Sequence, residues 1–362
     1  MSFLHLRDLR KTYPDGTEAV RGVDLAVEPG EFVVLLGPSG CGKTTTLRMI
    51  AGLELPTGGS IELGGRDVTR LSPRERDIGF VFQFYALYPH MSAAKNVAFP
   101  LECAGVPRPE RDRAVAEIAA RLGIESLLSK KPRTLSGGDQ QRVALARAMV
   151  RKPSIYLMDE PLGTLDADRR LAMCELIREQ AQELGVTTVY VTHDQEEAMR
   201  LADRIVVMRA GRIEHAGKAA EVYDSPATLF VAEFVGSPGM NRIAGKVLEG
   251  GRTFEVDGSG ARIDLPAATR PGPAVLGIRP EHLRVGSGGT GGSGSAPLTG
   301  RVVVDEYLGS DRCLHVDGPA GRLVSRVPPD GKSALGAELA LTPAPDRIRL
   351  YDPATGARLS ST

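Results

Sequence analysis

Short apolar runs alternate with segments of helical period from the N-terminus to about residue 234. The run Phe32–Leu36 predicts a strand buried on both faces, because it contains no polar residue. A glycine-rich loop and a helix closed by Gly52 follow it. Further buried strands are predicted at residues 155–158, 188–192 and 205–208, and helical segments separate these three strands from one another. Repeated strand–loop–helix units predict an α/β domain with a mostly parallel sheet, whose loops gather at the C-terminal ends of the strands.

The pattern changes after residues 236–239. Short alternating runs follow, separated by turns rich in Gly, Pro and Asp, and no long helical period appears. These runs predict a small all-β barrel or sandwich. We therefore expect one domain at residues 1–236 and a second at residues 237–362. Within the second, the stretch at about 286–295 consists mostly of Gly and Ser and predicts a flexible insert.

Composition and charge exclude several classes of protein. Lys+Arg and Asp+Glu each total 45 of 362 residues, and this balance argues against a nucleic-acid scaffold or a polybasic membrane-surface protein. No apolar run is long enough for a membrane-spanning helix, and the charged N-terminal residues are unlike a signal peptide. The four cysteines lie far apart without a CxxC pair, so we expect a reduced, cytosolic protein with neither a disulfide framework nor a zinc site.

A phosphate-binding motif lies between the strand at 32–36 and the helix that follows. It matches G-x-x-x-x-G-K-[ST] and comprises Gly37, Pro38, Ser39, Gly40, Cys41, Gly42, Lys43 and Thr44. The glycines allow backbone N–H groups to surround phosphate oxygens, and the helix N-terminus favours negative charge. Lys43 supplies a charge for the β- and γ-phosphates, and the Thr44 hydroxyl is a Mg²⁺ ligand. We also expect Cys41 to be a reactive thiol, because a helix N-terminus lowers a thiol pKa.

Two carboxylates follow the buried strand at 155–158. The parallel-sheet arrangement predicts that Asp159 lies near Thr44 and its metal ion. Glu160 is then available as the general base for an attacking water.

The most specific stretch is Leu-Ser-Gly-Gly-Asp-Gln-Gln-Arg at residues 135–142. It predicts a helix start capped by Ser136, with Gly137 and Gly138 exposing backbone N–H groups to a second anion. With this stretch the sequence resembles the ATP-binding subunits of ABC transporters, over nearly the whole chain. The resemblance implies an ABC cassette with a helical subdomain at about 84–150.

Four further residues match the family in the expected order. Tyr13 matches the aromatic residue that stacks on adenine, and Gln83 matches the glutamine loop. His193 matches the switch histidine, and Asp166 belongs to the loop after the catalytic glutamate. The resemblance adds Thr45 and Gln140 to the residues expected to bind ATP, and it makes Thr44, Gln83 and Asp159 the expected Mg²⁺ ligands.

The resemblance also implies a mechanism. Two copies form a head-to-tail homodimer, so that Ser136, Gly137 and Gly138 of one subunit close over the γ-phosphate held by Lys43 of the other. Glu160 polarises the water and His193 contacts the γ-phosphate, while electrostatic clamping supplies most of the catalysis. ATP binding closes the dimer and hydrolysis releases it.

Residues 82–91 and 276–283 resemble the maltose/trehalose and glycerol-phosphate type of importer subunit, in which a regulatory domain of oligonucleotide-binding (OB) type follows the ATPase. The expected partners are two transmembrane permease subunits and, indirectly, an extracytoplasmic solute-binding protein, with the chain peripheral on the cytoplasmic side of the membrane. Aromatic residues between Tyr85 and Phe99 suit a permease dock or local core packing. Iron, polyamine and sulfate importers share this architecture and stay open as alternatives.

Two residues depart from the family pattern. Asp139 stands where the family usually has Gln, and Gly163 where it often has Ser. We expect activity to survive both, because neither touches Lys43, Asp159 or Glu160.

Soluble ABC ATPases of DNA repair are a competing class, but residues 44–135 show no sustained heptads. A ribosome-acting cassette protein would need two cassettes in tandem. A β domain that reads oligonucleotides would need an aromatic and basic face, and the chain has no Trp.

Overall fold

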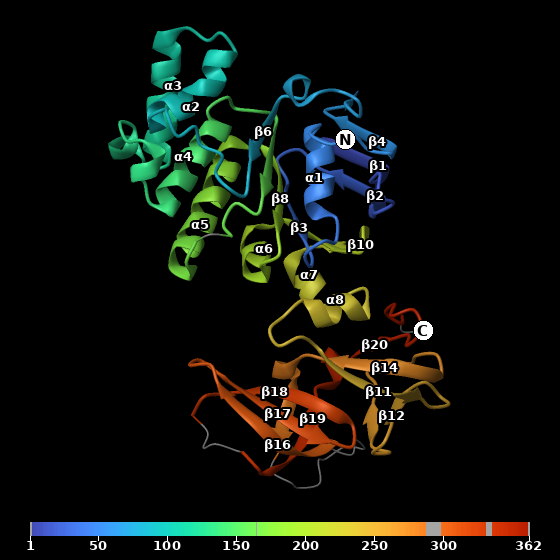
Figure 1. Cartoon of the computed structure of the whole chain (residues 1–362). Coiled ribbons are helices and arrows are strands. Elements are labelled where there is room, and N and C mark those ends of the chain that lie inside the picture. Colours follow the sequence, from blue (N-terminus) through green and yellow to red (C-terminus); the bar gives the residue numbers. More distant parts are fainter. Residues whose placement is uncertain (1, 164, 287–297, 331–334, 361–362) are drawn as a thin grey trace. The chain divides into compact units, whose positions relative to one another are not determined.

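The computed structural model describes residues 2–163, 165–286, 298–330 and 335–360 (Figure 1). The chain packs as two compact units, Met1–Ala219 and Ala220–Thr362. The insert expected at residues 286–295 lies outside the described residues, except for Gly286.

The first unit is built on a six-stranded sheet in the order β10-β9-β3-β8-β7-β6. All neighbouring strands are parallel except β10, which runs antiparallel to β9. Every residue of β3, β7 and β8 is buried, which explains why these strands contain few polar residues: β3 has none, β7 ends in Asp159, and β8 carries three threonines. The mostly parallel sheet is thus confirmed. Its strands are β3 (Phe32–Leu36), β6 (Ile78–Val81), β7 (Ile155–Asp159), β8 (Thr187–Thr192), β9 (Arg204–Arg209) and β10 (Arg212–Gly217).

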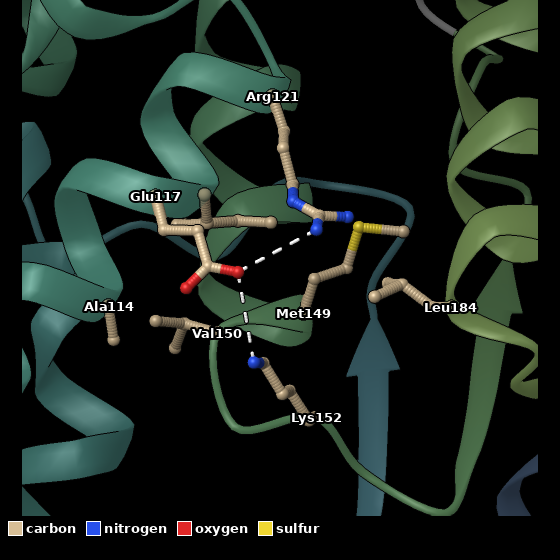
Figure 2. Close-up of a pocket in the computed structure, with 8 residues that line it drawn as sticks. Ala114, Glu117, Arg121, Met149, Val150, Lys152 and Leu184 are labelled. Carbon is tan, nitrogen blue, oxygen red and sulfur yellow. Dashed lines mark ion pairs between the residues drawn. The ribbon is translucent and has the colours of Figure 1, made fainter.

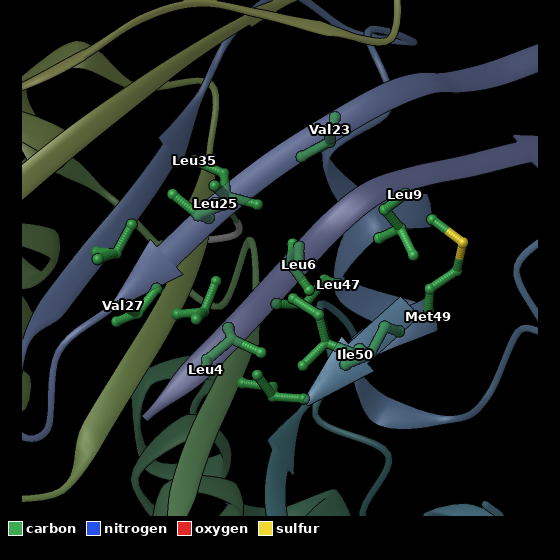
Figure 3. Close-up of a cluster of buried hydrophobic side chains, with 14 of the residues drawn as sticks. Leu4, Leu6, Leu9, Val23, Leu25, Val27, Leu35, Leu47, Met49 and Ile50 are labelled. Carbon is green, nitrogen blue, oxygen red and sulfur yellow. The ribbon is translucent and has the colours of Figure 1, made fainter. Parts of the chain in front are cut away.

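A second, antiparallel sheet in the same unit was not expected from the sequence. Its order is β2-β1-β4-β5, with β1 at Leu4–Thr12, β2 at Glu18–Val27, β4 at Gly58–Leu63 and β5 at Arg66–Asp67. Apolar residues of β1 and β2 pack with Leu47 and Ile50 of α1 in one buried cluster (Figure 3). Helix α1 (Lys43–Ala51), which begins at the phosphate loop, is therefore anchored in the core along one face.

Helices complete the first unit. They are α2 (Ala93–Cys103), α3 (Arg108–Arg121), α4 (Gly137–Met149), α5 (Ala167–Leu184) and α6 (Gln195–Leu201). Helix α3 is tied to its neighbours by charge: Glu117 pairs with Arg121 and with Lys152, which follows α4 (Figure 2). Arg121 also pairs with Glu183 of α5. Helices α2, α3 and α4 occupy the segment 84–150, where a helical subdomain was expected.

The second unit contains two five-stranded antiparallel sheets that share one apolar core. The first sheet, in the order β13-β12-β11-β14-β20, is formed by β11 (Asn241–Val247), β12 (Thr253–Val256), β13 (Arg262–Asp264), β14 (Gly272–Ile278) and β20 (Arg349–Tyr351). The second, in the order β15-β19-β16-β17-β18, is formed by β15 (Leu283–Gly286), β16 (Leu298–Tyr307), β17 (Arg312–Gly318), β18 (Gly321–Val327) and β19 (Glu338–Pro343). The expected all-β domain is confirmed.

Two short helices also belong to the second unit. They are α7 (Ala219–Asp224) and α8 (Leu229–Phe234). Buried Arg279, directly after β14, donates hydrogen bonds to main-chain carbonyls of both helical segments, at Tyr223 and Ala232. The packing unit therefore begins before residue 237, where the sequence places the start of the second domain; the domain limits 1–236 and 237–362 stay a prediction.

Candidate active site

The phosphate loop joins the end of β3 to the start of α1. Two of its glycines are required by close main-chain contacts. A Cβ on Gly37 would lie 2.4 Å from the carbonyl oxygen of Met208, and a Cβ on Gly42 would lie 2.4 Å from that of Ala19. Gly42 also has φ +104°, which disfavours any side chain. These contacts fix the loop against β9 and β2, and so position the N-terminus of α1.

The Lys43 side chain folds back over this loop. Its ammonium group donates hydrogen bonds to the carbonyl oxygens of Gly37 at 2.7 Å and Pro38 at 3.0 Å, and Lys43 is 4% exposed. The ammonium group is thus held over the loop by neutral carbonyls, whose place phosphate oxygens can take. The loop backbone, Lys43 and the helix N-terminus thus form a site for phosphate groups.

Thr44 and Asp159 meet at the edge of the sheet. Thr44 Oγ1 donates a hydrogen bond of 2.8 Å to Asp159 Oδ1, and Asp159 is 6% exposed. Burial raises the pKa of Asp159, with the Thr44 hydrogen bond opposing that shift. A hydroxyl and a carboxylate oxygen in contact are the hard donors that Mg²⁺ prefers. The prediction that Asp159 lies beside Thr44 is confirmed by this contact.

Three residues predicted from separate motifs converge on one carboxylate. Glu160 Oε2 lies 3.1 Å from His193 Nδ1 and accepts a longer hydrogen bond, 3.5 Å, from Gln83 Nε2. The three residues follow β7, β8 and β6, which are neighbours in the sheet. Parallel strands bring their C-terminal ends to one edge, and this explains why residues so far apart in sequence meet.

The backbone at Glu160 is strained. Its φ is +44°, a left-handed conformation that costs a non-glycine residue about 1–2 kcal/mol. Its N–H donates to the carbonyl of Val191 at 2.9 Å, which binds the turn to β8. The conformation directs the carboxylate towards His193 instead of continuing the strand.

The Ser-Gly-Gly stretch begins α4 as expected. Ser136 Oγ accepts a hydrogen bond of 3.3 Å from the N–H of Asp139, and Gln140 Nε2 donates to Leu135 O at 3.2 Å. Asp139, the departure from the family pattern, pairs with Arg142 one turn later at 2.6 Å. The negative charge of Asp139 is therefore paired with a positive charge on the same helix.

Two further predicted residues flank these motifs. Asp166 caps α5, where its Oδ1 accepts from the N–H of Arg169 at 3.0 Å. The hydroxyl of Tyr13 lies 3.4 Å from Thr45 Oγ1 on α1, and the Lys11 ammonium lies 5.1 Å from the Tyr13 ring centroid. The ring therefore stands beside the phosphate loop.

The Ser-Gly-Gly stretch and Asp166 do not join the phosphate loop within one chain. In the part of the chain that the structure describes, no hydrogen bond links Ser136, Gly137, Gly138 or Asp166 to residues 37–45. Gly138 instead faces Leu165, whose side chain lies 3.8 Å from the position of an added Cβ.

The expectation for Cys41 is wrong. Cys41 is 3% exposed, and burial raises the pKa of its thiol; the nearby Lys43 charge only partly offsets this. The sequence places Cys41 at a helix N-terminus but does not show that its Sγ packs into the core.

Sequence reasoning missed Gln141. It is 2% exposed, and its Nε2 donates a hydrogen bond of 2.6 Å to the carbonyl of Pro161. This bond ties α4 to the residue after Glu160. The signal available in the sequence was a polar residue at a position where the helical period of α4 predicts the buried face.

Comparison with known proteins matches both units. Residues 20–163 match the ABC transporter family, residues 236–283 the MalK OB fold domain, and residues 276–350 the TOBE domain. The sn-glycerol-3-phosphate import ATP-binding protein UgpC of Ruegeria pomeroyi is 46% identical, over 99% of this chain and 100% of its own. The protein of the same name from Cereibacter sphaeroides is 47% identical, over 99% of this chain and 100% of its own. This chain belongs to the ABC transporter family. It is an ATP-binding subunit.

Solved ABC cassettes share the fold of the first unit. A cassette solved as a dimer in a post-hydrolysis state with ADP and Pi is 36% identical, with a TM-score of 0.54 over 60% of this chain and 98% of its own. The cbiO1 protein of Clostridium perfringens, part of an ABC transporter complex, is 31% identical, with a TM-score of 0.57 over 61% of this chain and 90% of its own. The ABC resemblance and the OB-like second domain are confirmed. Among the described residues, no helix is long and apolar enough to cross a membrane.

Proposed function

We propose that this chain is the energy-coupling ATPase of an ABC importer and that it acts as a head-to-tail homodimer. The convergence of Gln83 and His193 on Glu160, beside the Thr44–Asp159 pair, carries the proposal. A general base and a hydrogen-bonding imidazole next to a phosphate loop are the groups that ATP hydrolysis requires.

Each group has a role in this proposal. Glu160 accepts a proton from the attacking water, while His193 and Lys43 stabilise charge on the γ-phosphate. The Lys43 ammonium exchanges the carbonyls of Gly37 and Pro38 for phosphate oxygens when nucleotide binds. The backbone of the loop, together with Thr45, surrounds the phosphates, and Tyr13 stacks on adenine.

Thr44, Asp159 and Gln83 would hold Mg²⁺. The direct contact between the Thr44 hydroxyl and buried Asp159 fits this ion, because both supply oxygen donors at one point. The ion would neutralise charge on the β- and γ-phosphates. The hydrogen bond from Thr44 fixes the position of Asp159 Oδ1, the oxygen that would bind the ion. Because Asp159 is buried, few water molecules can reach this carboxylate and compete for the ion.

The second half-site supports the homodimer. Among the described residues, no acceptor is found for the N–H groups of Gly137 and Gly138 at the N-terminus of α4, and such groups suit the γ-phosphate bound by another copy. Ser136 and Gln140 belong to that terminus, and the side chain of Leu165, the residue before Asp166, lies beside Gly138. The dimeric ADP-bound and Pi-bound relative has the same fold as the first unit.

The relatives' names support sn-glycerol-3-phosphate as the imported solute. Two transmembrane permeases would dock on the first unit, which has a groove of about 260 Å³ whose lining includes the aromatic residues Phe80, Tyr88 and Phe99. Tyr88 packs on Phe99 with ring centroids 4.8 Å apart, so part of this cluster is local packing. In this proposal the chain is peripheral on the cytoplasmic side of the membrane, and an extracytoplasmic solute-binding protein delivers the solute.

The Glu160→Gln variant tests the proposal. It should bind ATP but lose about 10²- to 10⁴-fold in turnover, because the amide cannot accept the proton from water. The ATP-bound dimer should then accumulate and be visible by light scattering. Exposed Glu175 on α5 gives the matched control, Glu175→Gln, which should hydrolyse ATP normally. Unchanged hydrolysis by Glu160→Gln would contradict the proposal.

A further inference from the structure

One guanidinium group joins two loops of the candidate site. Arg170, in the first turn of α5, donates a hydrogen bond of 3.1 Å from Nη2 to the carbonyl oxygen of Leu165. Its Nη1 donates one of 2.7 Å to Asp194 Oδ2. Leu165 directly precedes Asp166, in the segment that follows Glu160. Asp194 directly follows His193.

Asp194 is fixed on its other side as well. Its Oδ1 accepts hydrogen bonds from the N–H groups of Glu196 and Glu197 and so caps α6. Its own N–H donates to Thr192 Oγ1 at 2.9 Å. The turn that carries His193 is therefore held between the end of β8, the start of α6 and Arg170.

Glu197 completes the cluster. It is 4% exposed, and Oε2 accepts hydrogen bonds of 2.8 Å from Thr192 Oγ1 and from the Tyr190 hydroxyl. Its other oxygen lies 3.6 Å from Arg170 Nε. The guanidinium thus contacts groups on three sides, which the planar fork of an arginine allows and the single point charge of a lysine does not.

We propose that Arg170 is a positioning residue for ATP hydrolysis: it ties the segment at Leu165 to the turn of His193, and so holds the imidazole in register with Glu160. This inference rests on the proposed roles of Glu160 and His193. The 3.1 Å approach of His193 Nδ1 to Glu160 Oε2 is the geometry that the bridge preserves. Movement of the Leu165–Asp166 segment is transmitted through the same guanidinium to His193.

A purely stabilising role fits the surroundings less well. The Arg170 and Asp194 side chains are 32% and 23% exposed, and a cavity of about 220 Å³ lies beside them. Ion pairs that water reaches contribute little to the free energy of unfolding. The pair with Asp194 should therefore contribute little to stability, and buried Glu197 keeps its hydrogen bonds from Thr192 and Tyr190 when Arg170 is replaced. Because Arg170 nevertheless holds two loops of the site together, its loss should affect turnover more than folding.

The test measures steady-state ATP hydrolysis by the full chain. Arg170→Met should lower kcat about 10- to 100-fold, as expected when a reacting group is displaced by about 1 Å. KM for ATP should stay within about twofold, because phosphate binding at Lys43 is untouched. Arg170→Lys keeps the charge but cannot reach both loops, so it should also lose turnover.

Two further variants separate positioning from folding. Asp194→Asn retains the helix cap and removes the charge partner of Arg170. If the two residues act together, the double variant loses no more kcat than the more affected single variant. Arg178→Met is the matched control, because Arg178 lies on the same helix, is 24% exposed and pairs with Asp203. It should leave kcat unchanged.

The proposal is overturned if Arg170→Lys retains full kcat, if the losses in the double variant add, or if Arg178→Met loses as much as Arg170→Met. The wild-type chain and Glu160→Gln are assayed alongside. Failure of Glu160→Gln to lose turnover would count against the proposed function itself. Loss in Glu160→Gln with normal turnover in Arg170→Met would count against the bridge alone.

Discussion

Arg279→Met should unfold the second unit more easily. Arg279 is 2% exposed, and its guanidinium donates hydrogen bonds to Tyr223 O at 2.8 Å, to Ala232 O at 3.1 Å and also to Val235 O. The guanidinium carbon lies 4.1 Å from the centroid of the Tyr223 ring. Methionine retains an unbranched apolar stem but has no donor. The carbonyls of Tyr223 and Val235 lose this partner, whereas Ala232 O keeps its hydrogen bond from the N–H of Met240.

The expected magnitude follows from these contacts. A buried acceptor left without a donor costs about 1–3 kcal/mol. Such costs do not add fully, and burial lowers the pKa of Arg279, so removing its charge returns part of the loss. We therefore expect a loss near the lower end of the sum, about 3 kcal/mol. With a urea dependence of about 2 kcal/mol per M, the unfolding midpoint falls by about 1.5 M.

Unfolding in urea is followed by far-UV circular dichroism and by tyrosine fluorescence, since the chain has 8 Tyr and no Trp. Limited proteolysis separates the two units, because opening of residues 220–362 yields fragments of that part alone. The control is Arg322→Met, in which an exposed arginine of the same unit loses its pair with Asp317. It should change stability by less than about 0.5 kcal/mol. Equal midpoints for the two variants would refute the reasoning.

Two other predictions concern the first unit. Exposed Cys103 should react with a thiol reagent at least about tenfold faster than Cys41, because Cys41 is buried and its thiol pKa is raised. Mass spectrometry after brief labelling measures the extent of reaction at each cysteine, and equal rates would contradict the burial argument. Burial also raises the pKa of Asp159, so its carboxylate takes up a proton at a higher pH than an ordinary aspartate as the solution is acidified. Mg²⁺-dependent ATP binding should therefore weaken as pH falls towards that raised pKa, whereas the Asp159→Asn variant should lack this pH dependence. Calorimetric titration with Mg²⁺ and ATP across a pH series measures the affinity of both proteins. Identical pH profiles of affinity for the two proteins would exclude Asp159 as the titrating group.

The candidate site could be predicted from sequence because parallel sheets impose a simple rule. Glu160 and His193 each follow a strand that the sequence predicts, and the C-terminal ends of parallel strands share one edge. No strand is predicted before Gln83, which only the family resemblance assigns to the site. The rule needs only the order of strands and loops, which the sequence displays. The family resemblance then supplied the roles, which spacing alone does not contain.

Other features depend on packing that the sequence does not display. Arginine is usually exposed, yet Arg279 and Arg76 are 2% and 3% exposed. Arg76 donates to the carbonyls of Met49 and Ile50 at the C-terminal end of α1. The acceptors are main-chain groups of elements distant in the chain, so no local sequence pattern predicts that these arginines are buried. The antiparallel sheet of β1, β2, β4 and β5 was missed partly for a related reason, since the pairing of β1 with β4 joins strands far apart in the chain, although β1–β2 and β4–β5 are pairs of consecutive strands.

Helix α4 contacts two of the loops that carry site residues. Arg147 donates hydrogen bonds to the carbonyls of Tyr85 at 2.8 Å and Ala86 at 2.7 Å, directly after Gln83. Both acceptor residues have positive φ, so their conformation depends on such external support. Gln141, one and a half turns earlier, holds the carbonyl of Pro161 after Glu160. Because Ser136 caps the start of the same helix, a displacement of that N-terminus must either move both loops or break these bonds. In the proposed homodimer, this would link the nucleotide contacts at the start of α4 to those made by the two loops.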